Sequence, residues 1–218
     1  MKTRFSLMIL LVLIFATKSS AQTFRKWTFT QPKMGSPFSI IVYSNDSVKV
    51  SSATARAYKL VDSLNQVYSD YDAQSELSIL SQKGQSAGVS DALWDILKQS
   101  QVAYQKSNGA FDITIGPLVK LWRKARKEKQ LPADSVLHKA QASIGFQWVQ
   151  MNEKTHAVKL NKSAMQLDLG GIAKGYIAQK VVDFLAKEGL AASLVDAGGD
   201  LAMGQAPPSK KAWSVGVN

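Results

Sequence analysis

The sequence predicts a mixed α+β fold, in which helices pack on sheets whose strands are joined mainly by local hairpins. Apolar residues recur at helical three-to-four spacing in several segments, and short β-branched or alternating runs fall between them. No internal repeat or low-complexity linker divides the chain. Of the 218 residues, 45% are hydrophobic and 20% are charged, which suffices for a sizeable core and argues against a disordered or fibrous protein.

The first half of the chain predicts one strand and two helices. Phe38–Val42 is an apolar, β-branched run after a proline, which is typical of a buried strand. Residues 53–68 place their apolar side chains on one helical face, with a serine at 51 or 52 available as the N-cap. A second amphipathic helix is expected to begin after Ser90 and to end near Gly109.

The second half predicts a strand, a helix and then a β-rich end. Residues 165–169 alternate apolar and polar side chains as a strand does. After Gly171 the apolar period becomes helical, until Gly189 ends the helix. Short strands are expected at Ser193–Ala197, Asp200–Met203 and Ala212–Val217, the last two separated by a Pro207-Pro208 turn.

The first 21 residues predict a cleavable export signal. Met1–Arg4 is basic, Phe5–Ala16 is uncharged, and small residues at 19–21 suit cleavage before Gln22. The apolar run is shorter than the roughly 18 to 20 residues that a membrane-spanning helix requires. We therefore expect residues 1–21 to be a signal peptide and residues 22–218 to form one domain.

Composition narrows the function class. The chain has no cysteine, which excludes disulfides, thiol nucleophiles, zinc ribbons and lipid attachment at a lipobox cysteine. The net charge is +11, and loss of Lys2, Arg4 and Lys18 with the signal leaves +8. Because an exported protein meets little nucleic acid, we assign this surplus to anionic small molecules, an acidic partner or peripheral membrane contact, and expect no nucleic-acid binding.

The segment Leu167–Tyr176 joins the predicted strand to the predicted helix through Gly170 and Gly171. Free backbone amides at a helix start, beside glycines that let an anion come close, are typical of a phosphate site. Lys174 lies in the first turn, where a cation is disfavoured by about 0.3 to 1 kcal/mol. Asp168 is expected either to pair with Lys174 or to hold, together with it, a metal–phosphate ligand. A tight turn with a local ion pair is the simpler alternative.

Two further clusters combine glycines with a carboxylate. Asp112, within Ser107–Pro117, lies between two apolar residues, so its carboxylate is expected to be half-buried and to require a hydrogen-bond partner, or to cap neighbouring backbone. Asp196–Asp200 is either an ordinary turn or a second close-approach site. The recurrence of such clusters in one chain favours a diphosphate or nucleotide site.

A basic stretch runs from Lys120 to Lys129, with six Lys or Arg residues and one glutamate. It is either a solvated helix face or a docking surface for an acidic partner or lipid headgroups. The two histidines, His138 and His156, belong to no motif and are expected at the surface.

Five motifs in order span the chain from residue 34 almost to its end. They are Met34–Ser36, Ser69–Tyr71 with Ser75–Leu77, Gly109–Asp112 with Gly116–Leu118, Leu167–Tyr176, and Gly198–Asp200. Together they closely resemble the ApbE family of FAD:protein FMN transferases. The Asp-Leu-Gly-Gly-Ile-Ala-Lys-Gly core at 168–175 makes the resemblance specific.

The resemblance implies an exported, magnesium-dependent transferase of the periplasm or the outer face of the inner membrane. Such an enzyme moves the FMN half of FAD to a threonine hydroxyl of an acceptor protein, typically a flavin-carrying subunit of a membrane redox complex, and releases AMP. By motif, Asp168 and Lys174 are the implied catalytic residues, and the backbone carbonyl of Gly171 is the implied magnesium ligand. The implied FAD site is lined by Met34, Tyr71, Ala110, Phe111, Asp112, Asp168 and Lys174. Tyr71 is expected to stack on a planar ring or to pack in the core.

The sequence departs from the family pattern in three places. Ser36 stands where threonine is usual, and Asp196 where asparagine is frequent. The family also carries, beyond the strand that corresponds to 213–217, a His-x-x-Asp-Pro-like motif and a Thr-x-Ala-Asp-like segment that completes the magnesium site, whereas this sequence stops at Asn218. The alternatives to flavin transfer are therefore a fragment or shortened protein that binds FAD without transferring it, and hydrolysis of FAD to FMN and AMP.

Overall fold

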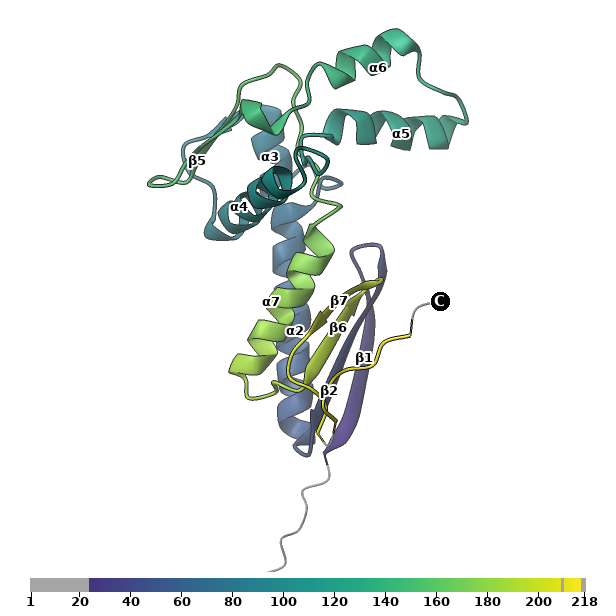
Figure 1. The fold of residues 1–218 in the computed structure, drawn as a ribbon, viewed down its shortest axis with the longest axis vertical. Coiled ribbons are helices and arrows are strands. Elements are labelled where there is room, and N and C mark those ends of the chain that lie inside the picture. Colours follow the sequence, from purple (N-terminus) through teal and green to yellow (C-terminus); the bar gives the residue numbers. More distant parts are fainter. Residues whose placement is uncertain (1–23, 209, 217–218) are drawn as a thin grey trace, which may run out of the picture.

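The computed structural model describes residues 24–208 and 210–216, which form two lobes stacked along the long axis of the molecule (Figure 1). The expected signal peptide, residues 1–21, lies outside the described residues. Within the described ranges, no helix combines the length and the apolar character needed to cross a membrane. One continuous cluster of buried apolar side chains runs through both lobes.

The lower lobe in Figure 1 is built on an antiparallel sheet with the strand order β1-β2-β6-β7. The strands are β1 (Arg25–Lys33), β2 (Ser36–Ser44), β6 (Ser193–Ala197) and β7 (Asp200–Met203). In β2, Phe38, Ile40 and Val42 are buried on one face, so the strand predicted over 38–42 is confirmed within a longer one. The β1–β2 turn consists of Met34 and Gly35, both at positive φ.

Two helices, α2 (Ser47–Tyr68) and α7 (Ala173–Lys187), cover one face of this sheet. Asp46 caps α2, because its carboxylate accepts a 2.9 Å hydrogen bond from the backbone N–H of Lys49. The helix therefore begins earlier than the predicted serine cap. Helix α7 ends two residues before Gly189, whose positive φ of 74° lets the chain turn away, as predicted.

The upper lobe contains α3 (Glu76–Lys83), α4 (Asp91–Lys106) and a small antiparallel sheet with the order β3-β5-β4. The hydroxyl of Ser90 caps α4 by accepting a 3.2 Å hydrogen bond from the N–H of Leu93, which confirms the predicted helix start. The three strands are β3 (Gln85–Ser86), β4 (Val149–Asn152) and β5 (Ala157–Leu160), and the 3-10 helix η1 (Phe146–Trp148) precedes β4. The sequence analysis did not predict this sheet, β1 or α3.

A helical hairpin projects sideways from the upper lobe (Figure 1). It consists of α5 (Gly116–Glu128) and α6 (Asp134–Gln141). Helix α5 contains the basic stretch as far as Glu128. Only Gly116 and Ala125 are buried in α5, and α6 has no buried residue, so both helices are largely exposed. The hairpin matters for the site because the first turns of α5 lie next to the neck between the lobes.

Two predicted strands are wrong. Residues 165–169 form no strand, and only Gln166 makes an isolated parallel bridge, to Ile115. The backbone N–H of Leu167 donates to the Ser81 hydroxyl and that of Asp168 donates to the Ile113 carbonyl, so no continuous ladder exists. The apolar alternation here reflects burial in the core.

The second wrong strand is the one predicted over Ala212–Val217, since residues 212–216 are not extended in a sheet and 217 lies outside the described residues. The indole of Trp213 anchors this tail instead. Its ring lies edge-on to Tyr43, with 5.9 Å between centroids, and its N–H donates to the Gln205 carbonyl at 3.0 Å.

Candidate functional site

A cavity of about 680 Å³ lies at the neck between the two lobes. The β1–β2 turn, the end of α2 with the turn after it, α5 and the start of α7 each contribute lining residues. Three of the predicted FAD-site residues, Met34, Tyr71 and Lys174, meet here although they are distant in sequence. The volume falls within the range of small-molecule and cofactor sites.

The glycine turn before α7 presents unpaired backbone groups at this cavity. The Asp168 carboxylate accepts a 2.7 Å hydrogen bond from the N–H of Gly170 and so shapes the turn. In the described part of the chain, the N–H groups of Lys174 and Gly175 donate no hydrogen bond, and the carbonyls of Gly170 and Gly171 accept none. The turn therefore offers amide donors for an anion next to carbonyl oxygens for a cation.

Arg123, on α5, is the main residue of the cavity that the sequence analysis did not identify. Its guanidinium donates hydrogen bonds to both Asp70 and Asp168, with 3.1 Å between Nη2 and Asp168 Oδ2. The guanidinium carbon also lies 4.0 Å from the centroid of the Tyr71 ring. No local pattern indicated this role, because the two carboxylate partners are 53 and 45 residues away in sequence.

The Asp168 carboxylate forms its ion pair with Arg123, so the ion pair expected as one alternative between Asp168 and Lys174 does not form. Lys174 makes no ion pair within the described residues. Its ammonium is thus a cation at the helix start without a local counter-charge, where the helix dipole disfavours it. A bound anion would supply the missing negative charge.

Burial raises the pKa of Asp168 above its usual value, and the nearby Asp70 charge acts in the same direction. The Gly170 amide and the Arg123 charge oppose this shift without cancelling it. For Arg123, burial lowers the pKa, but the hydrogen bond and charge of Asp70 outweigh burial and raise it overall. The guanidinium therefore stays charged, while Asp168 protonates more readily than an exposed aspartate.

Ser36 and Gly198 lie close to Lys174 on the sheet side of the cavity. A Cβ atom placed on Gly198 would lie 2.4 Å from Ser36 Oγ and 3.5 Å from Lys174 Nζ. Ser36 Oγ is buried and has no hydrogen-bond partner among the described residues. A hydroxyl and an ammonium thus border one small space, which only a glycine at 198 leaves open.

The Asp196–Asp200 cluster is the turn that carries Gly198. The Asp196 carboxylate accepts a 2.7 Å hydrogen bond from the N–H of Gly199. This contact is typical of an ordinary turn, which is one of the two alternatives that the sequence left open. The close approach occurs at Gly198 itself, against Ser36, so the cluster belongs to the same site and forms no second one.

The predicted residues 110–112 do not line the cavity. The Asp112 carboxylate accepts hydrogen bonds from the Thr114 N–H and hydroxyl at 2.8 and 2.7 Å and from the Phe146 N–H at 3.0 Å. It therefore caps neighbouring backbone, one of the two expected roles. Phe111 reaches the glycine turn, since its ring would lie 3.3 Å from a Cβ placed on Gly171, whereas Ala110 is exposed.

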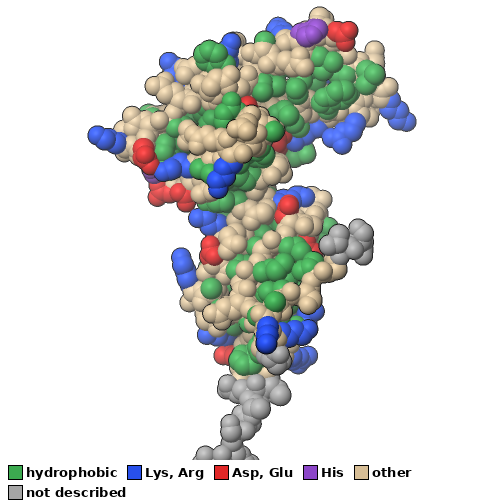
Figure 2. All heavy atoms as spheres, viewed as in Figure 1, with side chains coloured by type: hydrophobic (Ala, Val, Ile, Leu, Met, Phe, Trp, Pro, Cys, Tyr) green, Lys and Arg blue, Asp and Glu red, His purple; other side chains and the backbone are tan. Residues whose placement is uncertain are grey.

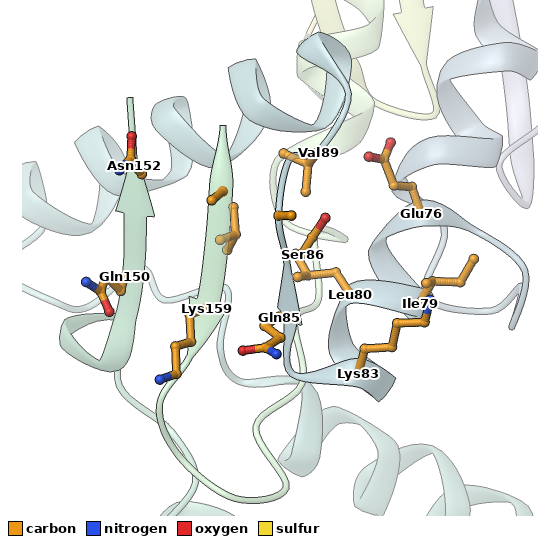
Figure 3. Close-up of a pocket in the computed structure, with 13 residues that line it drawn as sticks. Glu76, Ile79, Leu80, Lys83, Gln85, Ser86, Val89, Gln150, Asn152 and Lys159 are labelled. Carbon is orange, nitrogen blue, oxygen red and sulfur yellow. The ribbon is translucent and has the colours of Figure 1, made fainter. Parts of the chain in front are cut away.

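A second cavity, of about 720 Å³, lies between α3 and the small sheet (Figure 3). Its labelled side chains come from α3, β3, β4, β5 and the segment that follows β3, and they include the amides of Gln85 and Gln150 and the lysines Lys83 and Lys159. Glu76, at its edge, is occupied by hydrogen bonds from the N–H and hydroxyl of Ser90 at 2.6 and 2.5 Å. None of the predicted site residues lines this cavity.

The histidines lie outside the candidate site. His138 is exposed on α6, and His156 lies in the β4–β5 turn with its ring stacked on Trp94 at 4.5 Å between centroids. His156 Nδ1 also lies 3.2 Å from an Asp91 carboxylate oxygen. These contacts hold a partly exposed ring in place, in agreement with the surface location predicted for both residues.

The described part of the chain contains no group of three or more His, Cys, Asp or Glu side chains arranged to hold a metal ion. Near the cavity, Arg123 binds the Asp70 and Asp168 carboxylates, whereas the carbonyl oxygens of Gly170 and Gly171 accept no hydrogen bond and are of a type that binds hard cations.

The fold is that of the α+β flavin transferases. The flavin transferase ApbE from Vibrio cholerae superposes with a TM-score of 0.73 at 24% identity, over 84% of this chain and 60% of that one. The apo flavinyl transferase ApbE from Pseudomonas stutzeri gives a TM-score of 0.76 at 24% identity, over 89% of this chain and 62% of that one.

The chain belongs to the ApbE family, whose family model matches residues 34–218. A protein of Klebsiella pneumoniae (strain 342) called FAD:protein FMN transferase is 29% identical over 196 residues. One of the same name from Treponema pallidum (strain Nichols) is 30% identical over 209 residues. Each match covers 88% of this chain and 58% of the relative, so the chain spans less than two thirds of the length of these relatives.

Proposed function

We propose that this chain belongs to a magnesium-dependent FAD:protein FMN transferase, which transfers FMN from FAD to a threonine hydroxyl of an acceptor protein. The observation that carries the proposal is the neck cavity, where Met34, Tyr71 and Lys174 converge beside the free backbone groups of the glycine turn. Membership of the ApbE family and the names of its relatives support the same activity.

In this proposal, Lys174 and the amides at the start of α7 bind the diphosphate of FAD. Lys174 has no ion pair in the described part of the chain, and the amide donors beside it are unpaired, so an anion there gains charge-assisted hydrogen bonds without breaking existing ones. The Ser36 hydroxyl, which is buried next to Gly198, is proposed to donate a hydrogen bond to the same anion. The Lys174 ammonium and these hydrogen-bond donors would stabilise the negative charge that develops on phosphate oxygens during transfer.

The aromatic ring of Tyr71 is assigned to the flavin ring system. Its side chain is 80% exposed, so the core-packing alternative does not describe its position. Arg123 covers one part of the ring, and the rest is open to a planar ligand. Met34, held at positive φ in the β1–β2 turn, lines the same cavity from the opposite lobe.

Magnesium fits the free carbonyl oxygens of the glycine turn, so Gly171 is retained as a proposed ligand. When bound, the ion would neutralise charge on the diphosphate oxygens. The residues described here do not complete its ligand set.

The proposed reaction exchanges one phosphoanhydride bond for one phosphoester bond. The threonine oxygen bonds to the FMN phosphorus, the bond from that phosphorus to the bridging oxygen breaks, and AMP leaves with that oxygen. The hydroxyl proton passes to a base. Burial raises the pKa of Asp168, and its carboxylate accepts a hydrogen bond from the N–H of Gly170 in the glycine turn. Its proposed contribution is therefore to position the backbone amides that bind the phosphates.

The acceptor is proposed to be a flavin-carrying subunit of a membrane redox complex. We also propose that the protein acts outside the cytoplasm, in the periplasm or at the outer face of the inner membrane. The basic and then apolar N-terminal sequence, with small residues before Gln22, supports this location.

The direct test is to incubate the protein with FAD, magnesium and an acceptor that carries the target threonine. The expected result is an acceptor with covalent flavin fluorescence on a denaturing gel, and one AMP released for each flavin attached. An acceptor with alanine in place of the threonine should stay dark. Release of AMP and FMN without labelling would instead indicate FAD hydrolysis, and FAD binding with no AMP would indicate a binding protein.

Lys174→Ala and Lys187→Ala form a matched pair on the same helix. Lys174 lines the cavity, whereas Lys187 is exposed in the last turn of α7. We expect loss of labelling only in Lys174→Ala. Equal labelling by both variants would contradict the assigned phosphate site.

A further inference from the structure

The α5–α6 hairpin concentrates positive charge at a projecting part of the molecule. Between Lys120 and Lys139 there are seven Lys or Arg residues and two acidic residues, a net charge of +5, which is nearly half of the surplus of +11 in the whole chain. Figure 2 shows Lys and Arg side chains along the edge of the hairpin and near its outer end. A charge of this density favours an anionic partner.

Most of this charge is not used inside the protein. Arg123 belongs to the neck cavity, and Lys124 lies 4.0 Å from Glu128. Within the described ranges, the remaining basic side chains of the hairpin form no ion pair. These five are Lys120, Arg126, Lys127, Lys129 and Lys139.

The hairpin also exposes apolar side chains. The two helices pack mainly on each other, and α6 has no buried residue. Trp122 on α5, Leu131 in the loop between the helices and Val136 on α6 are all exposed. Leu131, at the hairpin tip, is 78% exposed and stands two residues after Lys129.

An exposed leucine that closely follows three basic residues in the sequence suits a lipid surface better than an acidic protein. Lysines act as point charges that any array of phosphates attracts, and a leucine among them gains free energy when it enters the headgroup–acyl boundary. An acidic protein surface would satisfy the charges but would leave Leu131 in a polar environment. We therefore infer that the hairpin tip, residues 126–131, docks on an anionic lipid membrane.

Docking through the hairpin tip would also suit flavin transfer to a membrane-bound acceptor. This link, unlike the docking itself, rests on the proposed function. Arg123 precedes Lys129 by six residues, or about 9 Å along a helix axis at 1.5 Å per residue. The neck cavity that Arg123 lines would therefore lie close to the membrane surface, where a membrane-bound acceptor presents its threonine. Vesicle binding itself requires neither FAD nor acceptor, so its failure is distinct from a failure of flavin transfer.

The test is cosedimentation of the protein with vesicles of equal parts phosphatidylglycerol and phosphatidylcholine, and with vesicles of phosphatidylcholine alone. We expect binding to the anionic vesicles that weakens with salt, and much weaker binding to the neutral ones. Replacing Arg126, Lys127 and Lys129 together with Gln should weaken binding about a hundredfold, since each basic residue near the surface contributes about 1 kcal/mol. Every variant carries the same N-terminus, so differences between variants report on the hairpin alone.

The matched control replaces three exposed lysines elsewhere, Lys59, Lys154 and Lys187, with Gln and removes the same charge. It should bind nearly as the unmodified protein does. Equal losses in the two triple variants would overturn the tip docking, because only net charge would then matter. The absence of anionic-vesicle binding by the unmodified protein would overturn it as well.

A second pair of variants tests the apolar contact. Leu131→Ser should weaken vesicle binding about tenfold, whereas Val48→Ser, at a side chain 79% exposed on α2, should have little effect. Retention of full affinity by Leu131→Ser would overturn the insertion of Leu131 on which the choice of a lipid over an acidic protein rests. Circular dichroism of each variant checks that the fold is intact.

Discussion

Replacement of Arg123 by Met tests whether the neck cavity depends on one cation shared by two carboxylates. The substitution keeps most of the aliphatic stem and removes the guanidinium. Asp168 and Asp70 then lose their counter-charge, although their side chains are only 7% and 12% exposed. The Tyr71 ring also loses the cation packed on its face.

The expected cost follows from this burial. Removal of one partner from a buried pair destabilises a protein by about 3 to 5 kcal/mol, because a charge is left without compensation. Arg123 itself is partly exposed, so we take the lower end, about 3 kcal/mol at pH 7, with the contact to Tyr71 included. With a urea slope of about 2 kcal/mol/M, the midpoint of unfolding should fall by about 1.5 M.

The pH dependence gives the prediction a definite sign. Burial already raises the pKa of Asp168, and the Arg123 charge opposes that shift, so the variant should have a still higher Asp168 pKa. The deficit is largest where Asp168 is ionised in both the folded and unfolded states. It should shrink as the pH falls through the raised pKa, because protonation removes the unpaired charge.

The assay is urea unfolding, followed by tryptophan fluorescence, at several pH values between 4.5 and 8. Arg126→Met is the control, since Arg126 is exposed on the same helix and forms no ion pair in the described part of the chain; its effect should stay within about 0.5 kcal/mol. Arg123→Lys should recover only part of the stability, because a lysine does not reproduce the planar fork. A deficit below about 0.5 kcal/mol for Arg123→Met, or one that does not change with pH, would refute the reasoning.

Three glycine substitutions give further expectations that can be measured by the same unfolding assay. Gly116→Ala should destabilise the protein by about 2 kcal/mol, since the new Cβ would lie 2.6 Å from the backbone carbonyl oxygen of Gln166; an unchanged urea midpoint would contradict this close packing. Gly175→Ala, whose Cβ meets nothing within 4 Å inside α7, should instead stabilise by about 0.5 to 1 kcal/mol, and a loss of stability would show that the space is not open. Gly198→Ala should lose stability through its φ of +68° and its contact with Ser36, and should also weaken FAD binding measured by flavin fluorescence; undiminished FAD affinity would place the ligand elsewhere.

The arrangement of the neck cavity separates two positive groups with different roles. Arg123 is held by Asp70 and Asp168 and belongs to the structure of the cavity wall. Lys174 has no such partner among the described residues and remains available to a ligand. For this reason, Lys174→Ala is expected to affect flavin labelling of the acceptor, whereas Arg123→Met is expected to affect the stability of the fold.

The sequence by itself determined the α+β class, the helix that begins after Ser90, the helix after Gly171 and the chemistry of the turn before it. It also predicted the helical period of residues 53–68, but not the start of α2 at Ser47. These features depend on apolar period, capping residues and glycines, all of which act over a few neighbouring residues. The motif order also led to the ApbE family, which the match over residues 34–218 confirms.

Only the tertiary structure decided which charges meet and where apolar alternation becomes a strand. Asp168 pairs with Arg123 across 45 residues and not with Lys174 in the same turn. Residues 165–169 alternate like a strand, but their amides find the Ser81 hydroxyl and the Ile113 carbonyl in place of a neighbouring strand. The physical reason is the same in both cases: a hydrogen bond or ion pair forms with whatever partner the fold brings within about 3 Å, and the fold brings together segments that are far apart in sequence.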